Sequence, residues 1–264
     1  MKNSTLAKYL APPRSAPELA RRTAAPEAGQ FHGAKSGAGV WQTIINQIPP
    51  HDTFVEAFAG TATITRLMRP AAARIVIESD AAVSQVLRAR FGADAGVTVV
   101  CGDAVSWLEK YRAKFTRRTV IYCDPPYLFS VRSTRRVRYG HEFGQEWLHG
   151  ELLAVLSRIA CQEVPVLLSG YRSELYDRMI GHWRRLDYRA MTHGGVRLES
   201  LWCSHDEPDE LHDWRYFGRN YRERLYLRRL VKRWLARLDA MPARKRGYVL
   251  DAIVQRQLRR GEIP

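Results

Sequence analysis

The stretch TVIYCDPPY, residues 119–127, decides the fold class that this sequence predicts. Its first half, Thr119–Cys123, is a short β-branched and apolar run, typical of a strand buried on both faces of a parallel sheet. Its second half, Asp124-Pro125-Pro126-Tyr127, begins directly where the apolar run ends. The sequence therefore predicts a rigid polar turn at the carboxyl end of a strand, where open α/β sheets place their functional groups.

Further strands and helices are predicted on both sides of this stretch. Apolar residues recur at helical spacing between short apolar runs, for example at Leu148, Leu152 and Leu156, and earlier from Trp41 to the Pro49-Pro50 stop. Strands that alternate with helices form a parallel sheet covered on both faces. We therefore expect a Rossmann-like α/β fold. The other predicted strands are Thr53–Ala57, Arg74–Glu78, Val97–Cys101 and Val164–Ser169.

The two ends of the chain differ from this central region. Residues 1–28 are rich in Ala, Pro and Arg and lack apolar periodicity, so we expect a flexible basic arm. After Cys203, an acidic and aromatic segment precedes a basic helix with Leu227, Leu230 and Trp234 on one face. We therefore expect an α/β domain over residues 29–203, which carries this turn, and a basic helical extension over residues 204–264.

The charge of the chain points to a polyanionic partner. Among 264 residues, 42 are Lys or Arg and 27 are Asp or Glu, which gives a formal net charge of +15. Each phosphate that a basic side chain neutralises releases counterions, so nucleic acid is the leading partner class. An anionic membrane surface also fits this charge, but no stretch reaches the ~18 apolar residues of a spanning helix. No signal-peptide core is visible at the N-terminus, and we expect a cytosolic protein.

The cysteines and histidines predict no metal site. Cys101, Cys123, Cys161 and Cys203 lie far apart without a C-x-x-C pair, so we expect reduced core residues. The eight histidines show no ligand spacing such as H-E-x-x-H. We expect neither a disulfide nor a protein-bound metal.

The Asp124-Pro125-Pro126-Tyr127 turn suits methyl transfer to an exocyclic amine of a base. The lone pair of such an amine is delocalised into the ring, so acceptors must hold its two hydrogens and aim the nitrogen at the methyl. The Asp124 carboxylate and the Pro125 carbonyl are two such acceptors, the prolines stiffen the turn, and Tyr127 offers a face for a flipped base. The alternative is a strand-terminating turn in an unrelated fold, with Asp as a turn residue and Tyr as rim packing.

Three other predicted strands end in residues suited to a nucleoside cofactor. Phe58-Ala59-Gly60 is a small-residue loop that lets the backbone approach a ligand, although Gly60 could serve only the turn. Glu78 ends the next strand, where a carboxylate can accept both ribose hydroxyls. Asp103 follows the third strand, placed to accept from an adenine amino group. One such acid is commonplace as a helix N-cap, but three at consecutive strands are less so.

These motifs resemble those of DNA adenine methyltransferases of the D-P-P-Y type, particularly the deoxyadenosine methylases of phages and prophages. The similarity runs from about Phe31 to beyond Trp202. It includes Phe31-His32-Gly33-Ala34-Lys35, Phe58-Ala59-Gly60, Asp124 to Tyr127, Leu168 to Tyr171, Glu174 to Asp177 and Glu199 to Trp202.

The resemblance implies methyl transfer from S-adenosylmethionine to the N6 amine of adenine in duplex DNA, in a bacterial or phage-derived modification system. It implies direct transfer to a flipped base, with Asp124, Pro125, Pro126 and Tyr127 as catalytic residues. It also implies that the cofactor lies near Phe31, Gly33, Lys35, Phe58, Ala59, Gly60, Glu78 and Asp103.

Three departures from the family pattern stand out. Ala57 replaces a usual proline, and Thr61-Ala62-Thr63 replaces a run richer in glycine or serine, which could weaken cofactor binding. Only 20 residues, 104–123, separate Asp103 from Asp124, the interval into which the family usually inserts its base-reading domain. That domain is missing or moved.

Two basic segments remain to contact DNA. A loop after the catalytic turn contains Arg132, Arg135, Arg136 and Arg138, and the C-terminal helix contains Arg228 and Arg229. We expect base contacts from the loop and phosphate contacts from the helix, although either could be a solvated basic face. N4-cytosine methylation, RNA adenine methylation and a non-catalytic DNA-binding protein with this fold stay open as alternatives, as does the oligomeric state.

Overall fold

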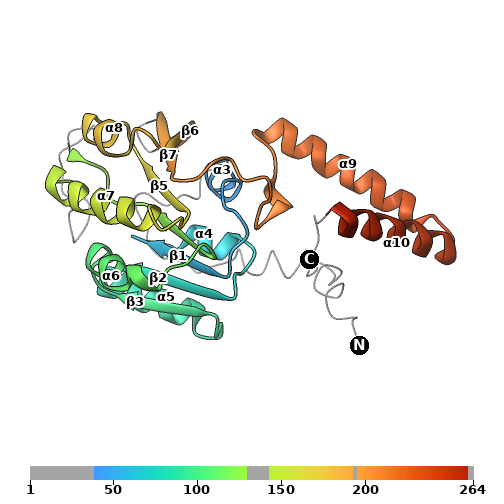
Figure 1. The fold of residues 1–264 in the computed structure, drawn as a ribbon, viewed down its shortest axis with the longest axis horizontal. Helices are drawn as coiled ribbons and strands as arrows, with labels where there is room; N and C mark the ends of the chain where they lie inside the picture. Colours follow the sequence, from blue (N-terminus) through green and yellow to red (C-terminus); the bar gives the residue numbers. More distant parts are fainter. Residues whose placement is uncertain (1–38, 130–142, 193–194, 261–264) are drawn as a thin grey trace. The chain divides into compact units, whose positions relative to one another are not determined.

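The computed structural model describes residues 39–129, 143–192 and 195–260 of the chain (Figure 1). They belong to one compact unit over Ala34–Pro264. Its centre is a seven-stranded sheet with helices on both sides. The strands are β1 (Thr53–Ala57), β2 (Ala73–Glu78), β3 (Val97–Cys101), β4 (Thr119–Cys123), β5 (Val166–Gly170), β6 (Arg184–Thr192) and β7 (Gly195–Cys203).

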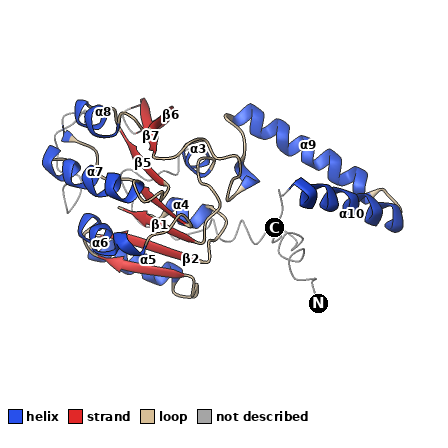
Figure 2. Cartoon of the chain, viewed as in Figure 1, coloured by secondary structure: helices blue, strands red, loops and turns tan. Residues whose placement is uncertain are grey.

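The helices alternate with the strands as far as β6 and then follow β7 as a pair (Figure 2). They are α3 (Val40–Ile45), α4 (Thr63–Leu67), α5 (Ala81–Phe91), α6 (Ala104–Tyr111), α7 (Glu146–Ala160), α8 (Glu174–Ile180), α9 (Tyr221–Asp239) and α10 (Ala243–Arg260). Two short 3-10 turns, η1 (Arg112–Lys114) and η3 (Trp214–Tyr216), complete the described elements.

The sheet has the order β3-β2-β1-β4-β5-β7-β6. Neighbouring strands from β3 to β5 are parallel, whereas β7 runs antiparallel to both β5 and β6. The five strands expected from the sequence are all present, and β5 begins two residues later than expected. The Rossmann-like α/β class is confirmed.

The helices form one layer on each face of the sheet. Alternate strand residues point to opposite faces, so Val55 and Ile121 pack with α6, α7 and α8, whereas Phe54 and Val120 pack with α3 and α4. Helix α5 covers Val76 on the α3–α4 face. The central strands β1, β4 and β5 are buried on both faces, which explains the continuous apolar runs in their sequences.

The β6–β7 hairpin was not expected from the sequence. It pairs nine residues of each strand, from Arg184 opposite Cys203 to Thr192 opposite Gly195. Strand β6 lies at the edge of the sheet and carries Arg and Asp side chains among its apolar ones. An edge strand of this kind lacks the apolar run that identifies a buried strand.

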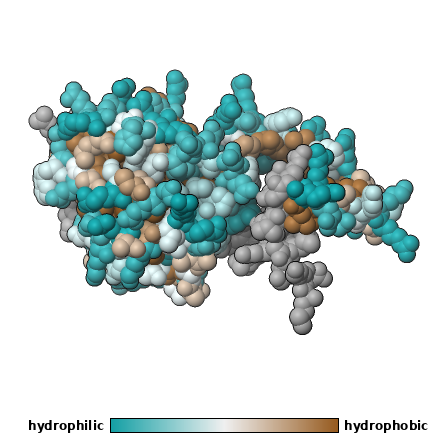
Figure 3. All heavy atoms as spheres, viewed as in Figure 1, coloured by the Kyte–Doolittle hydropathy of each residue, from teal (hydrophilic) through white to brown (hydrophobic). Residues whose placement is uncertain are grey.

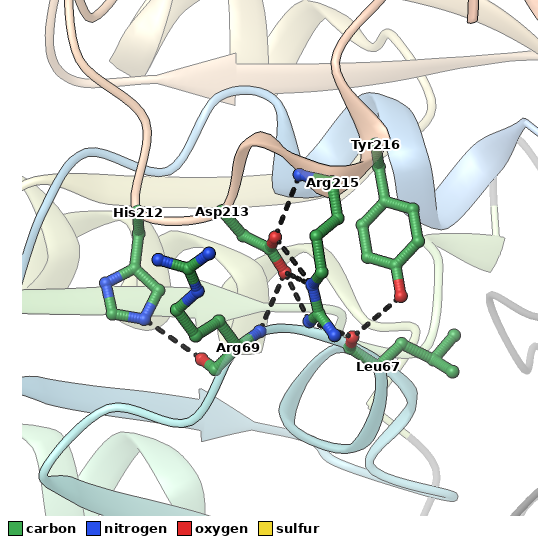
Figure 4. A network of polar contacts seen from close by, with 6 residues as sticks. All are labelled: Leu67, Arg69, His212, Asp213, Arg215 and Tyr216. Carbon is green, nitrogen blue, oxygen red and sulfur yellow. Dashed lines mark hydrogen bonds and ion pairs between the residues drawn. The ribbon is translucent and has the colours of Figure 1, made fainter. Parts of the chain in front are cut away.

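The segment after β7 is fixed to the sheet domain by a polar network (Figure 4). The Asp213 side chain is fully buried and accepts hydrogen bonds from the Arg69 backbone N–H at 2.8 Å and from the Arg215 guanidinium. The Arg215 guanidinium and the Tyr216 hydroxyl both donate to the Leu67 carbonyl. These hydrogen bonds fix residues 213–216, at the start of the C-terminal extension, to the end of α4.

Helices α9 and α10 leave apolar side chains exposed among their basic ones (Figure 3). Val231, Trp234 and Leu235 of α9 are each more than half exposed, and no residue of α9 is buried. Two helices thus follow β7, which ends at Cys203. On the apolar face expected for α9, Leu227, Leu230 and Leu238 are half-buried, whereas Val231, Trp234 and Leu235 stay exposed.

The cysteines only partly match the expected core positions. Cys123 and Cys203 are buried, but Cys101 and Cys161 are exposed, because they end an edge strand and a helix respectively. Within the described ranges, no helix is long and apolar enough to cross a membrane. No group of three or more His, Cys, Asp or Glu side chains in those same ranges could hold a metal ion.

Candidate active site

Four strand ends form a row along the carboxyl edge of the sheet. Because the order is β3-β2-β1-β4, Asp103, Glu78, the Phe58–Gly60 loop and Asp124 follow one another along this edge. Neighbouring strands lie ~4.8 Å apart, so the row spans roughly 14 Å. Asp124 lies at the end of this row.

The turn Asp124-Pro125-Pro126-Tyr127 is anchored to the sheet at its first residue. The Asp124 N–H donates to the Ala57 carbonyl of β1 at 3.3 Å, which continues the β1–β4 pairing by one residue. Pro125 is buried, and the Tyr127 ring lies 4.4 Å from the ring of Tyr171, centroid to centroid. Burial, together with the charge of Asp124, raises the pKa of Tyr127 well above its ordinary value, so its hydroxyl stays protonated.

The loop after β1 has an unusual backbone. Phe58, Gly60 and Ala62 have φ angles of 57°, 51° and 49°. Only glycine adopts this left-handed region without cost, so Phe58 and Ala62 store about 1–2 kcal/mol each. A Cβ added to Gly60 would meet no described atom within 4 Å, so space lies open in front of the loop. Thr61-Ala62-Thr63, which stands where the family has a run richer in glycine or serine, therefore folds here with a strained backbone at Ala62.

Glu78 connects two loops at the carboxyl edge. Its Oε2 accepts the Gly60 N–H at 2.8 Å, and its Oε1 accepts the Asp80 N–H at 3.0 Å. A carboxylate offers about four lone-pair positions, so acceptor capacity remains for a ligand. Its neighbour Asp103 is exposed and caps α6 through a 2.7 Å bond from the Ser106 N–H. A Cβ on Gly102, beside Asp103, would also meet no described atom within 4 Å.

Glu56 is a buried acid that was not predicted as part of the site. Its side chain is 3% exposed and accepts the backbone N–H groups of Ile64 and Thr65 at the start of α4. Burial, reinforced by the nearby charge of Asp124, raises its pKa to about 7 against the opposing hydrogen bonds. A glutamate inside the apolar run Thr53–Ala57 was the available signal.

Three more side chains near the turn come from distant parts of the sequence. His149 of α7 is buried and contacts the Pro126 carbonyl, and Tyr171 follows β5. Glu199 of β7 is buried and accepts from the Tyr188 hydroxyl at 3.3 Å. His149 occupies a core position of its helix, one turn before Leu152, and a polar residue at such a position could have revealed it.

The other predicted site residues are not part of this edge of the described structure. Arg228 and Arg229 lie exposed on α9. The remaining predicted residues lie outside the described ranges, namely Phe31, Gly33 and Lys35 of the cofactor set and Arg132, Arg135, Arg136 and Arg138 of the basic loop.

Comparison with known proteins gives similarity at the level of the fold. No protein-family model matches the chain, and no curated protein matches it. A SAM-dependent methyltransferase from Agrobacterium tumefaciens is 12% identical, with 62% of this chain and 60% of that chain covered and a TM-score of 0.42. The precorrin 8W decarboxylase of Methanobacterium thermoautotrophicum is 12% identical, with 62% and 87% covered and a TM-score of 0.39. The reaction must therefore be argued from this chain's own residues.

Proposed function

We propose that this protein is an S-adenosylmethionine-dependent methyltransferase that acts on the N6 amine of adenine in duplex DNA. The observation that carries the proposal is the Asp124-Pro125-Pro126-Tyr127 turn, which directly follows β4 and is bonded through Asp124 to β1. It stands at the end of a row of cofactor-suited groups on one sheet edge.

The residues of this edge fit the proposed cofactor. Glu78 would accept from the ribose hydroxyls, Asp103 would lie towards the adenine, and the open space before Gly60 and Gly102 would admit the ligand. Phe58 borders this space and packs against the main core. When bound, S-adenosylmethionine supplies an electrophilic methyl group.

The turn itself orients the acceptor amine. The Asp124 carboxylate and the Pro125 carbonyl accept the two amine hydrogens, which directs the nitrogen lone pair towards the methyl group. No proton has to leave before the transfer, and no covalent enzyme intermediate forms. After it, the methylated nitrogen carries a positive charge and both hydrogens, and it releases one as a proton, for which the Asp124 carboxylate is the acceptor at hand. Burial raises the pKa of the neighbouring Cys123 thiol, which suits a core residue and not a nucleophile.

The duplex is the substrate because the chain is strongly basic and the target base can leave the stack. Flipping a base costs a few kcal/mol, which stacking on an aromatic ring and phosphate contacts offset. Tyr127, paired with the Tyr171 ring, provides the aromatic surface. The basic loop with Arg135 and Arg136 is proposed to read bases and α9 to contact phosphates.

Methylation of plasmid DNA tests this function. The purified protein and S-adenosylmethionine are incubated with plasmid, which is then sequenced by a method that distinguishes N6-methyladenine from N4-methylcytosine. Asp124→Ala is the matched inactive variant, with an expected rate loss of ~10²–10³ because one preorganised polar group is removed. Its cofactor affinity, measured by calorimetry, should stay unchanged.

Four outcomes contradict the proposal or its mechanism. Methyl groups on N4 of cytosine would show that the target base is cytosine and not adenine. Activity on RNA alone would show that the substrate is RNA and not duplex DNA. Cofactor binding without methylation of any nucleic acid would exclude the proposed reaction. Activity of Asp124→Ala within a few-fold of the parent would refute the mechanism.

A further inference from the structure

A buried histidine of α7 contacts the catalytic turn. The His149 side chain is 1% exposed, and its Nε2 lies 3.0 Å from the Pro126 carbonyl oxygen. A carbonyl oxygen only accepts hydrogen bonds, so Nε2 carries the hydrogen. In the neutral imidazole Nδ1 is then an acceptor, and the Tyr176 hydroxyl, 2.8 Å away, donates to it.

The turn needs such a contact because its own backbone offers few donors. Pro125 and Pro126 have no N–H, so the backbone pairing that ends at Asp124 cannot continue through them. The Pro126 carbonyl belongs to the peptide group that leads into Tyr127. Fixing this carbonyl therefore fixes the direction in which the Tyr127 ring leaves the turn.

The imidazole is held in place by aromatic rings on two sides. Its centroid lies 5.1 Å from the ring of Phe143 and 5.7 Å from that of Tyr176. Phe143 in turn contacts Phe58 of the β1 loop at 4.9 Å, and Tyr176 contacts Trp202 of β7 at 4.9 Å. This packing leaves the imidazole little freedom to find another partner.

The Tyr176 hydroxyl is suited to a permanent donor role. Its side chain is 1% exposed, and burial raises its pKa above the ordinary value, so the hydroxyl keeps its proton. This donor reinforces the Nε2–H tautomer that the Pro126 carbonyl already favours. With the hydrogen on Nδ1, the Tyr176 hydroxyl would lose its acceptor, and the Nε2 lone pair would face the lone pairs of the Pro126 carbonyl.

We propose that His149 and Tyr176 are a positioning pair for the catalytic turn. The Tyr176 hydroxyl reinforces the imidazole tautomer, and His149 Nε2–H holds the Pro126–Tyr127 peptide so that Tyr127 and Asp124 meet the target base in a fixed geometry. The inference rests on the proposed function. Neither side chain touches the reacting atoms. A displacement of the turn by about 1 Å would slow the reaction on the order of 10²-fold.

Steady-state kinetics of three variants test the pair. His149→Leu should lower kcat for DNA methylation ~100-fold, with KM for DNA and for S-adenosylmethionine within about twofold of the parent, because loss of a supporting hydrogen bond typically costs 10–100-fold. His149→Gln, which can still donate an N–H to the Pro126 carbonyl, should recover most of kcat. Tyr176→Phe should lower kcat about tenfold. His182→Gln, at an exposed histidine, and Tyr111→Phe of α6 are the matched controls.

A merely structural role makes a different prediction. It would lower the melting temperature in all three variants while kcat of the folded protein stayed at the parent value, and that result would overturn the proposal. Equal losses of kcat in His149→Leu and His149→Gln would also overturn it. If His149→Leu fails to fold, the other two variants carry the test.

Nitrogen NMR of the imidazole gives a readout that does not depend on the reaction. The parent should show the Nε2–H tautomer for His149, and Tyr176→Phe should weaken this preference, because only the Pro126 carbonyl then favours it. An Nδ1–H tautomer in the parent would overturn the pair, whatever the activity. If the parent methylates no nucleic acid, the proposed function fails, and the NMR result alone supports or overturns the hydrogen-bonded pair.

Discussion

Replacing Glu56 with Gln should remove a pH dependence of the free energy of unfolding. The carboxyl is 3% exposed, and burial raises its pKa from 4.5 to about 7. Between these two values the folded state holds a proton that the unfolded state has released. The contribution to stability is therefore complete below pH 4.5 and is lost as the pH rises through 7. One pKa unit corresponds to about 1.4 kcal/mol, so the whole window corresponds to about 3 kcal/mol.

Urea denaturation of the parent and of Glu56→Gln at pH 5 and pH 8 measures this effect. Gln accepts only one of the two N–H groups at the start of α4, which costs the variant a constant amount at every pH. The stability of Glu56→Gln relative to the parent should nevertheless rise by roughly 2–3 kcal/mol from pH 5 to pH 8. Glu151→Gln, at an exposed position of α7, is the control. A difference between Glu56→Gln and the parent that is the same at both pH values would refute the reasoning.

Other variants test the cofactor edge, the start of the extension and the basic helix. Glu78→Ala and Asp103→Ala should each weaken S-adenosylmethionine binding by about 1–3 kcal/mol in calorimetry, because polar partners lose their acceptor; unchanged affinity in both would remove them from the site. Asp213→Asn should destabilise the fold by about 2–4 kcal/mol at pH 7. Burial alone would raise the pKa of Asp213, but Arg215 beside it lowers the net value below 3.8. The difference in the free energy of unfolding between the parent and Asp213→Asn should therefore shrink as the pH falls below 3.8. A difference that stays the same at every pH would contradict this prediction. Arg228→Ala combined with Arg229→Ala should weaken binding to all DNA sequences alike and reduce its salt dependence, and an altered sequence preference would reverse that assignment.

The buried strands could be predicted because they are short apolar runs rich in β-branched residues and bounded by turn residues. All five residues of Thr119–Cys123 are buried, as expected for a strand covered on both faces. Strand β6 escaped prediction for the opposite reason. One side of it faces solvent at the sheet edge, and its arginines hide the alternation of Leu186 and Tyr188 with polar residues.

The site could be predicted where its residues follow one another directly in the sequence. Asp124 to Tyr127 stands at the end of β4 as expected. His149 and Glu199 reach the neighbourhood of the turn only through the packing of α7 and the reversal of β7, which a single sequence does not reveal. Asp103 shows that a position predicted to be functional can also have an ordinary structural role. Its side chain accepts the Ser106 N–H as the N-cap of α6, which alone explains an acid at that position.

If the substrate is DNA as proposed, the reversal of β7 also has a consequence for the length of the duplex that binds best. Leu167, near the start of β5, is paired with Cys203 at the end of β7, so the chain leaves the sheet at the amino edge, across the sheet from Asp124. A five-residue strand separates these edges by about 17 Å, the length of roughly five base pairs. Oligonucleotides that cover only the target base should therefore support the chemistry yet lack the affinity of duplexes long enough to reach the extension as well.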